Sequence, residues 1–103
     1  WVDFNLYGHQ IVAHLAPMDR DKQQKNIVDG DEIPSRHFGV ILDWAEWQIL
    51  CKKIMDKNVK FYLKPKIRFK NKKGEQGTFF ILDPSSNVLE FKAFKHDKMV
   101  FEK

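Results

Sequence analysis

The chain has 103 residues, of which 43% are hydrophobic and 31% charged, as is typical of one small globular domain with a modest core. No apolar run approaches the roughly 20 residues of a membrane span, and no signal peptide is evident. Cys51 is the single cysteine, so an internal disulfide is excluded, and the composition fits a reducing compartment. We therefore expect a cytoplasmic protein without a membrane partner.

The net charge is +4, and much of the positive excess lies in one run between residues 64 and 73. Its basic residues alternate with apolar ones, so a strand or loop would direct them to one side: Lys64, Lys66, Arg68, Lys70, Lys72 and Lys73. A solvated basic face is the favoured interpretation. The alternatives are the rim of a site for an anionic small molecule and a nucleic-acid contact, and a nucleic-acid partner is not expected.

Residues 1–16 predict a β-hairpin, with "WVDFNL" and "QIVAHLA" as strands around the turn "YGH". The chain opens in mid-strand without an initiator methionine, so we expect an upstream segment before Trp1. Residues 17–35 are polar, charged and rich in turn formers, and they predict a loop or linker. A loop of this length marks either a boundary between structural units or a functional flap.

Residues 36–95 predict one unit of strand, helix and three strands, followed by a tail at residues 96–103. The strands are expected in "HFGVIL", "VKFYLKP" (ended by Pro65), "GTFFILD" and "VLEFKAF". "DWAE" predicts a capping box between Asp43 and Glu46, and Asn58 suits the residue after the helix. An apolar stripe that includes Cys51 indicates the buried side of this helix. A helical crossover and two hairpins allow the first strand to lie parallel beside the fourth.

Two residues of this unit predict chemistry. Glu90 lies between Leu89 and Phe91 in mid-strand, which is costly for an uncompensated carboxylate. His37 opens the first strand, and Gly39 on the same face predicts an open volume beside it. If the strands are neighbours, the imidazole and carboxylate converge, and a second histidine would complete a two-histidine, one-carboxylate metal site. The alternatives are a satisfied structural histidine and a solvent-facing glutamate paired with a lysine.

The stretches "HFGVIL" and "GEQGTFFILDPSSNVLEFKAF" resemble the vicinal oxygen chelate superfamily, which includes glyoxalases, extradiol dioxygenases and bleomycin-resistance-type binding proteins. The most specific element is the closing stretch, with its acidic-Pro turn, a small residue, Asn and then Glu. The resemblance implies an α+β fold with a complete second βαβββ module at residues 36–95. Residues 1–16 would then be the last strands of an incomplete first module.

The same resemblance implies a divalent metal held by His37 and Glu90, with Glu90 also taking part in catalysis. The metal would be iron, zinc, nickel or manganese, and a further histidine is expected on the absent first strand of the first module. His14 is expected to line the pocket, because the ligating position of that strand is occupied by Val12. Arg68, in a loop over the site, and Lys92, beside Glu90, are expected to contact substrate. Lys92 could instead pair with Glu90 and favour a metal-free site.

The sequence therefore leads to two hypotheses of function. The first is a metal-dependent dioxygenase, lyase or isomerase that chelates two adjacent oxygens of a small molecule. The second is a binding module of the same fold that sequesters a drug or antibiotic without chemistry. A homodimer that pairs exposed sheet edges is expected in either case.

Overall fold

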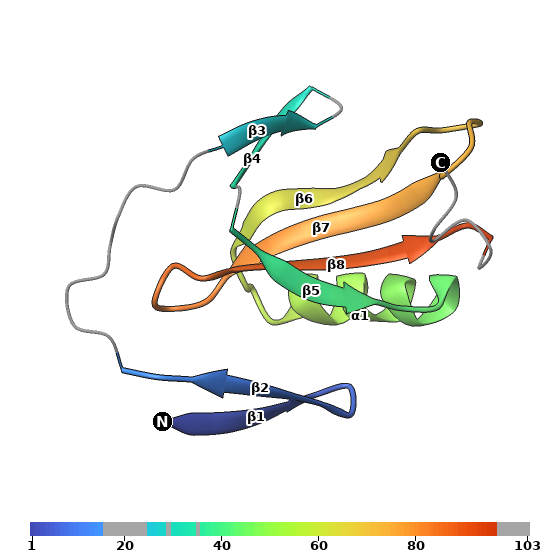
Figure 1. Ribbon diagram of the computed structural model, residues 1–103. Helices are drawn as coiled ribbons and strands as arrows, with labels where there is room; N and C mark the ends of the chain where they lie inside the picture. The colour runs from blue at the N-terminus through green and yellow to red at the C-terminus, as the bar shows by residue number, and fades with distance from the viewer. Residues whose placement is uncertain (16–24, 29, 35, 97–103) are drawn as a thin grey trace.

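The computed structural model describes residues 1–15, 25–28, 30–34 and 36–96 (Figure 1). The elements are β1 (Val2–Leu6), β2 (His9–Ala13), β3 (Lys25–Val28), β4 (Asp31–Pro34), β5 (Phe38–Ile41), α1 (Trp44–Asp56), β6 (Phe61–Arg68), β7 (Gln76–Leu82) and β8 (Val88–Phe94). From β5 onward this is the predicted order of strand, helix and three strands. The α+β fold class with a βαβββ module is thereby confirmed.

The module is built on a four-stranded sheet in the order β5-β8-β7-β6. β5 runs parallel to β8, with Gly39 opposite Glu90, and the other neighbours are antiparallel. The first and last strands of the module therefore lie side by side, as the topology predicted (Figure 1). This pairing brings the start of β5 to the middle of β8.

Helix α1 covers one face of the sheet with a tightly packed apolar cluster. We call this set the helix-side cluster; its buried members are Leu42, Trp47, Cys51, Phe79, Phe91 and Ala93. The Trp47 indole donates a hydrogen bond of 2.9 Å to the Phe91 carbonyl oxygen. A Cβ at Gly77 would lie 2.7 Å from the Trp47 ring, so the helix approaches β7 as closely as a glycine permits.

The ends of α1 confirm one predicted cap and correct the other. Asn58 adopts φ 55°, the left-handed conformation expected just beyond the helix. The predicted capping box is wrong, because the Asp43 side chain makes no capping hydrogen bond. The helix begins instead through the backbone, where the Trp47 amide donates to the Asp43 carbonyl oxygen at 2.9 Å.

The second face of the sheet is covered by a hairpin that the sequence analysis had placed within a loop. β3 and β4 pair antiparallel, and Gly30 between them adopts φ 84°. Ile33 of β4 packs on Phe80 and Val88, and these three residues form what we call the hairpin-side cluster. Burial of Ile33 outweighs the polar character of its neighbours, so the loop prediction is wrong for the two strands Lys25–Val28 and Asp31–Pro34. The rest of the predicted loop at residues 17–24 and most of the predicted tail lie outside the described residues.

Strand β6 continues through Pro65, where the sequence analysis ended it. β6 is an edge strand, so the backbone groups along its outer edge have no neighbouring strand in this sheet to pair with. The register with β7 also shifts between Leu63 and Lys66, which removes the need for an amide hydrogen at Pro65. The strand therefore extends to Arg68 and carries three predicted loop residues, Lys66, Ile67 and Arg68, into the sheet.

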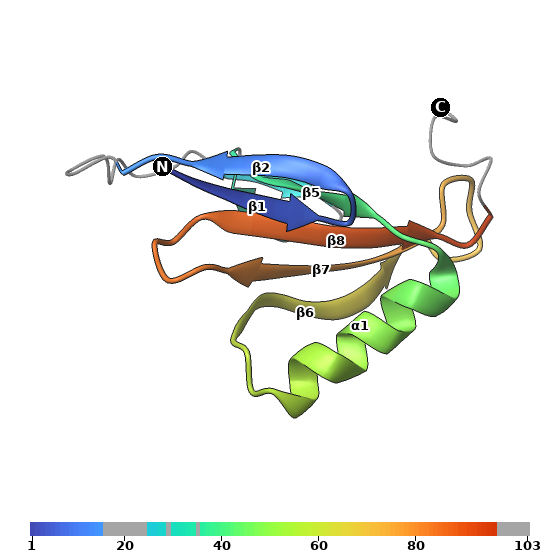
Figure 2. The same ribbon diagram turned by 90° about the horizontal axis from the view of Figure 1, so that it is seen from below.

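The predicted hairpin at residues 1–16 is confirmed as β1 and β2, which pair antiparallel in a sheet of their own. It is separate from the four-stranded sheet in Figure 1 and is drawn in front of β5 in the view of Figure 2, and Leu6 packs against the helix-side cluster. Its large side chains include Trp1, which is 82% exposed. Within the described ranges, no helix is long and apolar enough to cross a membrane.

Candidate functional site

His37 and Glu90 meet on the face of the sheet opposite α1. His37 precedes β5, and Glu90 lies in the middle of the neighbouring strand β8. The His37 Nε2 atom is 3.5 Å from Glu90 Oε1, and the two side chains are 29% and 12% exposed. The convergence expected from the sequence is therefore present, and both groups remain accessible to a small ion.

The two carboxylate oxygens of Glu90 have different surroundings. Oε2 accepts a 2.6 Å hydrogen bond from the Thr78 hydroxyl and lies 3.6 Å from the Lys92 ammonium. Oε1 faces His37. Thr78, which is fully buried on β7, thus fixes the carboxylate so that one oxygen is held by the protein and the other is directed at the imidazole.

The orientation of the His37 ring is fixed from its other side. Nδ1 lies 2.8 Å from the Pro34 carbonyl oxygen. A carbonyl oxygen only accepts hydrogen bonds, so Nδ1 carries the proton of this contact. In the neutral ring Nε2 then presents a lone pair to Glu90 Oε1. A cation between these two atoms, which lie 3.5 Å apart, would contact both. The edge-on contact with Phe80, at 5.2 Å between ring centres, holds the ring in place.

Gly39 has a different role from the one expected. From the sequence, Gly39 was expected to leave an open volume beside His37. A Cβ at this position would instead collide with the backbone carbonyl of Glu90. The missing side chain therefore allows the close approach of β5 to β8 that brings the two functional groups together.

The donor set of this site fits a divalent transition metal. An imidazole nitrogen and a carboxylate oxygen are ligands shared by iron, zinc, nickel and manganese. With bonds of about 2.1 Å, two such ligands lie about 3 to 3.5 Å apart, and the observed Nε2–Oε1 distance falls at the end of that range. Among the described residues, no group of three His, Cys, Asp or Glu side chains converges on one point. The described part of the chain therefore offers two ligands.

The other residues predicted for the site are distributed over three places. Lys92 lies beside Glu90, as expected. His14 follows β2 on the separate hairpin, where its ring is 6.2 Å from that of Trp1, and it does not join His37 and Glu90. Arg68 lies in β6 rather than in an overhanging loop, and its side chain is buried against the β3–β4 hairpin. The loop placement of Arg68 was wrong because β6 passes Pro65.

Three groups that shape the site were not identified from the sequence: the Thr78 hydroxyl, the Pro34 carbonyl and the carboxylate of Asp31 near Arg68. Thr78 had a detectable signal, since it alternates with the core residues Gly77 and Phe79 and so faces the same side as Glu90. The backbone carbonyl of Pro34 carries no sequence signal.

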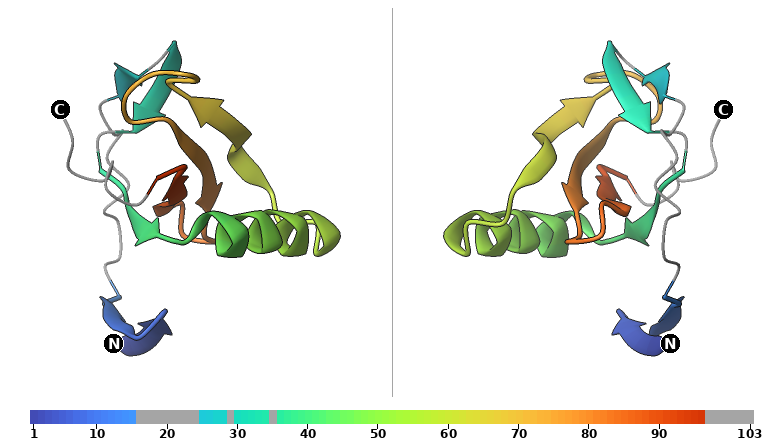
Figure 3. Two further views of the ribbon diagram at one scale, coloured as in Figure 1. Left: turned by 90° about the vertical axis from the view of Figure 1, so that its right-hand side faces the viewer. Right: turned by 90° about the vertical axis from the view of Figure 1, so that its left-hand side faces the viewer.

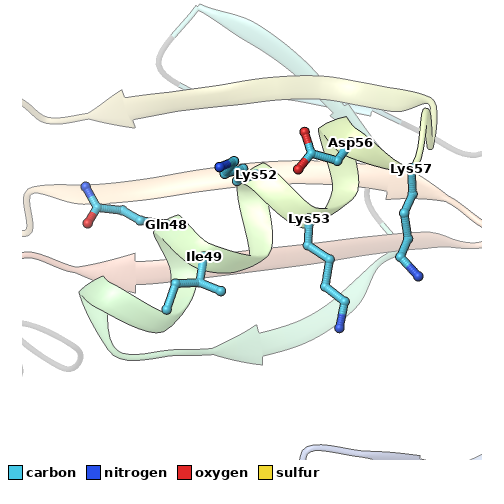
Figure 4. Close-up of a pocket in the computed structure, with 6 residues that line it drawn as sticks. All are labelled: Gln48, Ile49, Lys52, Lys53, Asp56 and Lys57. Atoms are coloured by element: carbon cyan, nitrogen blue, oxygen red, sulfur yellow. The ribbon is translucent and has the colours of Figure 1, made fainter.

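A hollow that lacks the predicted site residues lies on the outer side of α1 (Figure 4). Its lining is Gln48, Ile49, Lys52, Lys53, Asp56 and Lys57. This surface belongs to one helix, contains none of the predicted site residues and has a single carboxylate among three lysines. It therefore offers no ligand set comparable to His37 and Glu90.

Comparison with known proteins agrees with the fold of the chain. The chain is similar to the crystal structure of a glyoxalase/bleomycin resistance protein/dioxygenase from Alicyclobacillus acidocaldarius, with 31% identity and a TM-score of 0.77. The match covers 96% of this chain and 70% of the other. No protein-family model and no curated protein sequence matches the chain. The extent and identity of the structural match, together with the βαβββ module, show that the chain belongs to the glyoxalase/bleomycin resistance/dioxygenase family, the vicinal oxygen chelate superfamily.

Proposed function

We propose that His37 and Glu90 provide two ligands of a divalent-metal site in an enzyme of the glyoxalase or extradiol dioxygenase type, which acts on a small oxygenated molecule. The observation that carries the proposal is the pair of acceptor atoms, His37 Nε2 and Glu90 Oε1, facing each other at 3.5 Å. A bound metal ion would satisfy both atoms and would supply Lewis-acid polarisation of two adjacent substrate oxygens.

The protein's own part in this function is to hold the two ligands in place. The Pro34 carbonyl fixes the tautomer of His37, so that Nε2 is the free nitrogen. Thr78 holds Oε2 of Glu90, so that Oε1 is the free oxygen. Lys92, 3.6 Å from that carboxylate, would contact an anionic oxygen of the substrate in this proposal. Phe80 closes one side of the imidazole against water.

The remaining protein ligand comes from outside the described residues in this proposal. A further histidine could belong to a preceding segment or to a second copy of the chain. Among the described histidines, the family resemblance brings His14 nearest to the position of a metal ligand. Because His14 follows β2 on the separate hairpin, we propose that it lines the pocket.

The second candidate is a metal-free module that binds a small drug-like molecule. It is favoured by the Lys92 ammonium, which lies 3.6 Å from Glu90 Oε2 and can neutralise that carboxylate without a metal. In this case Lys92 and the 3.5 Å contact with His37 would compensate Glu90 without a metal ion. Both candidates use the same three side chains, so metal affinity separates them.

The test is a calorimetric titration of the metal-free chain with Zn²⁺ and, separately, Mn²⁺. We expect one binding event that weakens about tenfold or more in His37→Ala and in Glu90→Ala, because each removes one of two ligands. His9→Ala and Glu32→Gln are matched controls at exposed positions and should bind as the unmodified chain does. Equal metal affinity in His37→Ala, Glu90→Ala and the unmodified chain would refute the metal site and favour the binding module.

A further inference from the structure

A second polar cluster lies on the same face of the sheet, where the β3–β4 hairpin meets β6. The Lys66 ammonium is 2.8 Å from Asp31 Oδ2, and Arg68 Nη2 is 3.2 Å from the same oxygen. Arg68 Nη1 donates a 2.6 Å hydrogen bond to the Val28 carbonyl oxygen. Among the residues that the structure describes, two cations thus face one carboxylate.

Arg68 is unusual in this cluster because it is 2% exposed. Its Nη2 atom is buried and makes no hydrogen bond of acceptable geometry within the part of the chain that the structure describes. The contact with Asp31 at 3.2 Å is therefore an ion pair whose geometry falls short of a full hydrogen bond. A buried guanidinium nitrogen with unused donor capacity is costly, and it is the group best suited to a second carboxylate oxygen.

The strand register places this cluster in line with the proposed metal ligands. Lys66 is opposite Thr78, and Thr78 is opposite Lys92, so the three side chains lie in one row across β6, β7 and β8. Opposite residues of neighbouring strands share a face, and Thr78 contacts Glu90. Two strand spacings separate Lys66 from Lys92, a distance of about 10 Å. Figure 3 shows the β3–β4 hairpin and α1 at different sides of this sheet.

We propose that Lys66 and Arg68 form a binding site for a small carboxylate and that Asp31 of the β3–β4 hairpin occupies this site as a built-in competitor. The Asp31 carboxylate stands where the carboxylate of a ligand would bind, and a ligand displaces it. The hairpin then acts as part of the binding site, instead of serving as a linker.

The charge of Asp31 agrees with this assignment. The hydrogen bond from Lys66 is the main cause that lowers the pKa of Asp31, and the charges of Lys66 and Arg68 lower it further. The cluster therefore stabilises an ionised carboxylate. A neutral ligand would lose these contacts, which restricts the site to anions.

The site also bears on the substrate class, and this step rests on the proposed function. A molecule with a carboxylate at Lys66 and Arg68 and two adjacent oxygens near Glu90 would cross from β6 to β8. The two strand spacings between these strands amount to about 10 Å. The proposed enzyme would accordingly act on an oxygenated carboxylic acid.

The experiment is a titration of the chain with sodium acetate in the presence of a metal chelator. Two-dimensional NMR of the backbone amides monitors the binding. Sodium chloride at equal ionic strength is the reference. We expect saturable shifts at Asp31, Lys66 and Arg68 with acetate and not with chloride. Lys66→Met should weaken acetate binding at least tenfold, while Lys64→Met, on the exposed part of the same strand, should leave it unchanged. Asp31→Asn should tighten it at least tenfold by removing the competitor.

The proposal is overturned if the unmodified chain responds to acetate and chloride alike, or if Lys66→Met and Lys64→Met bind acetate equally. The comparison of these two lysine variants decides the question even if Asp31→Asn does not fold. Because no metal is present in the acetate titration, a negative result there does not refute the His37–Glu90 metal site. A negative result in the metal titration likewise does not refute the carboxylate site.

Discussion

The two faces of the four-stranded sheet are built from alternate residues of the same strands, and they differ in nearly every physical property. Toward α1, β7 and β8 present Phe79, Phe91 and Ala93, which are at most 5% exposed and pack on the Trp47 indole. On the opposite face, the same strands present Thr78, Glu90 and Lys92, which bind one another through hydrogen bonds and charge. The helix-side face is apolar throughout these positions, whereas the opposite face combines the groups capable of chemistry with the hairpin-side cluster, which also contributes stability.

This difference shows how a short chain carries a costly polar site. A half-buried carboxylate is tolerated because Thr78, Lys92 and His37 compensate Glu90 and because the apolar clusters supply the free energy of folding. Substitutions on the apolar face should therefore change stability, and substitutions on the polar face should change binding.

The largest expected effect is that of Phe79→Ala. Phe79 is fully buried, so its truncation should lower the free energy of unfolding by about 3 to 5 kcal/mol, measured by urea denaturation. Phe4→Ala, on the exposed β1–β2 hairpin, is the matched control and should cost well under about 1 kcal/mol. Similar losses in the two variants would show that the apolar face is not the source of stability.

The next effect compares two glycines, one for each face. Gly77→Ala places a methyl group against Trp47, and Gly39→Ala places one against the Glu90 backbone. Each should cost about 1 to 3 kcal/mol of stability. Gly39→Ala should also weaken metal binding, because it forces β5 away from β8, whereas Gly77→Ala should not. Equal metal affinity in both variants would contradict the role given to Gly39.

Much of this arrangement could be predicted from the sequence. The order of elements, the parallel pairing of β5 with β8 and the meeting of His37 with Glu90 all follow from periodicity and chain topology, with the family resemblance. These features are set by local patterns and by the handedness and length of connections. The α+β fold class needed no knowledge of side-chain packing.

The β3–β4 hairpin and the position of Arg68 could not be predicted in the same way. Residues 25–34 are rich in charge, and their stability comes from Ile33 packing on residues of β7 and β8 that are distant in sequence. The Asp-Gly dipeptide at residues 29–30 favours a hairpin turn, but the polar and charged composition of the surrounding residues favours a loop. Arg68 was misplaced because the bulge that allows β6 to pass Pro65 depends on its partner strand.

A smaller effect concerns the pH dependence of the polar face. The pKa of Asp31 is lowered below its ordinary value of 3.8, first by the hydrogen bond from Lys66. Its ion pairs therefore stabilise the fold above that value, and their contribution is lost as the pH falls through the lowered pKa. The difference in unfolding free energy between the unmodified chain and Asp31→Asn should shrink below about pH 4. A difference that stays constant from pH 7 to pH 3 would contradict this.

The smallest effect concerns Cys51 on the apolar face. Burial raises the pKa of this thiol from 9.0 to about 11, so the folded protein favours the neutral form and loses stability as the pH rises above 9. At pH 8 a disulfide reagent should modify Cys51 at least about tenfold more slowly in the native protein than in urea. Equal rates would show that the helix-side cluster opens readily.

In the proposed site, Nε2 of His37 and Oε1 of Glu90 bind one metal ion. The most direct measurement is the ¹⁵N NMR spectrum of the His37 imidazole before and after addition of Zn²⁺. The account predicts that Nδ1 remains protonated, held by the Pro34 carbonyl, while the Nε2 resonance moves to the value of a metal-bound nitrogen. An unchanged His37 spectrum, or a shift at Nδ1 instead, would contradict it.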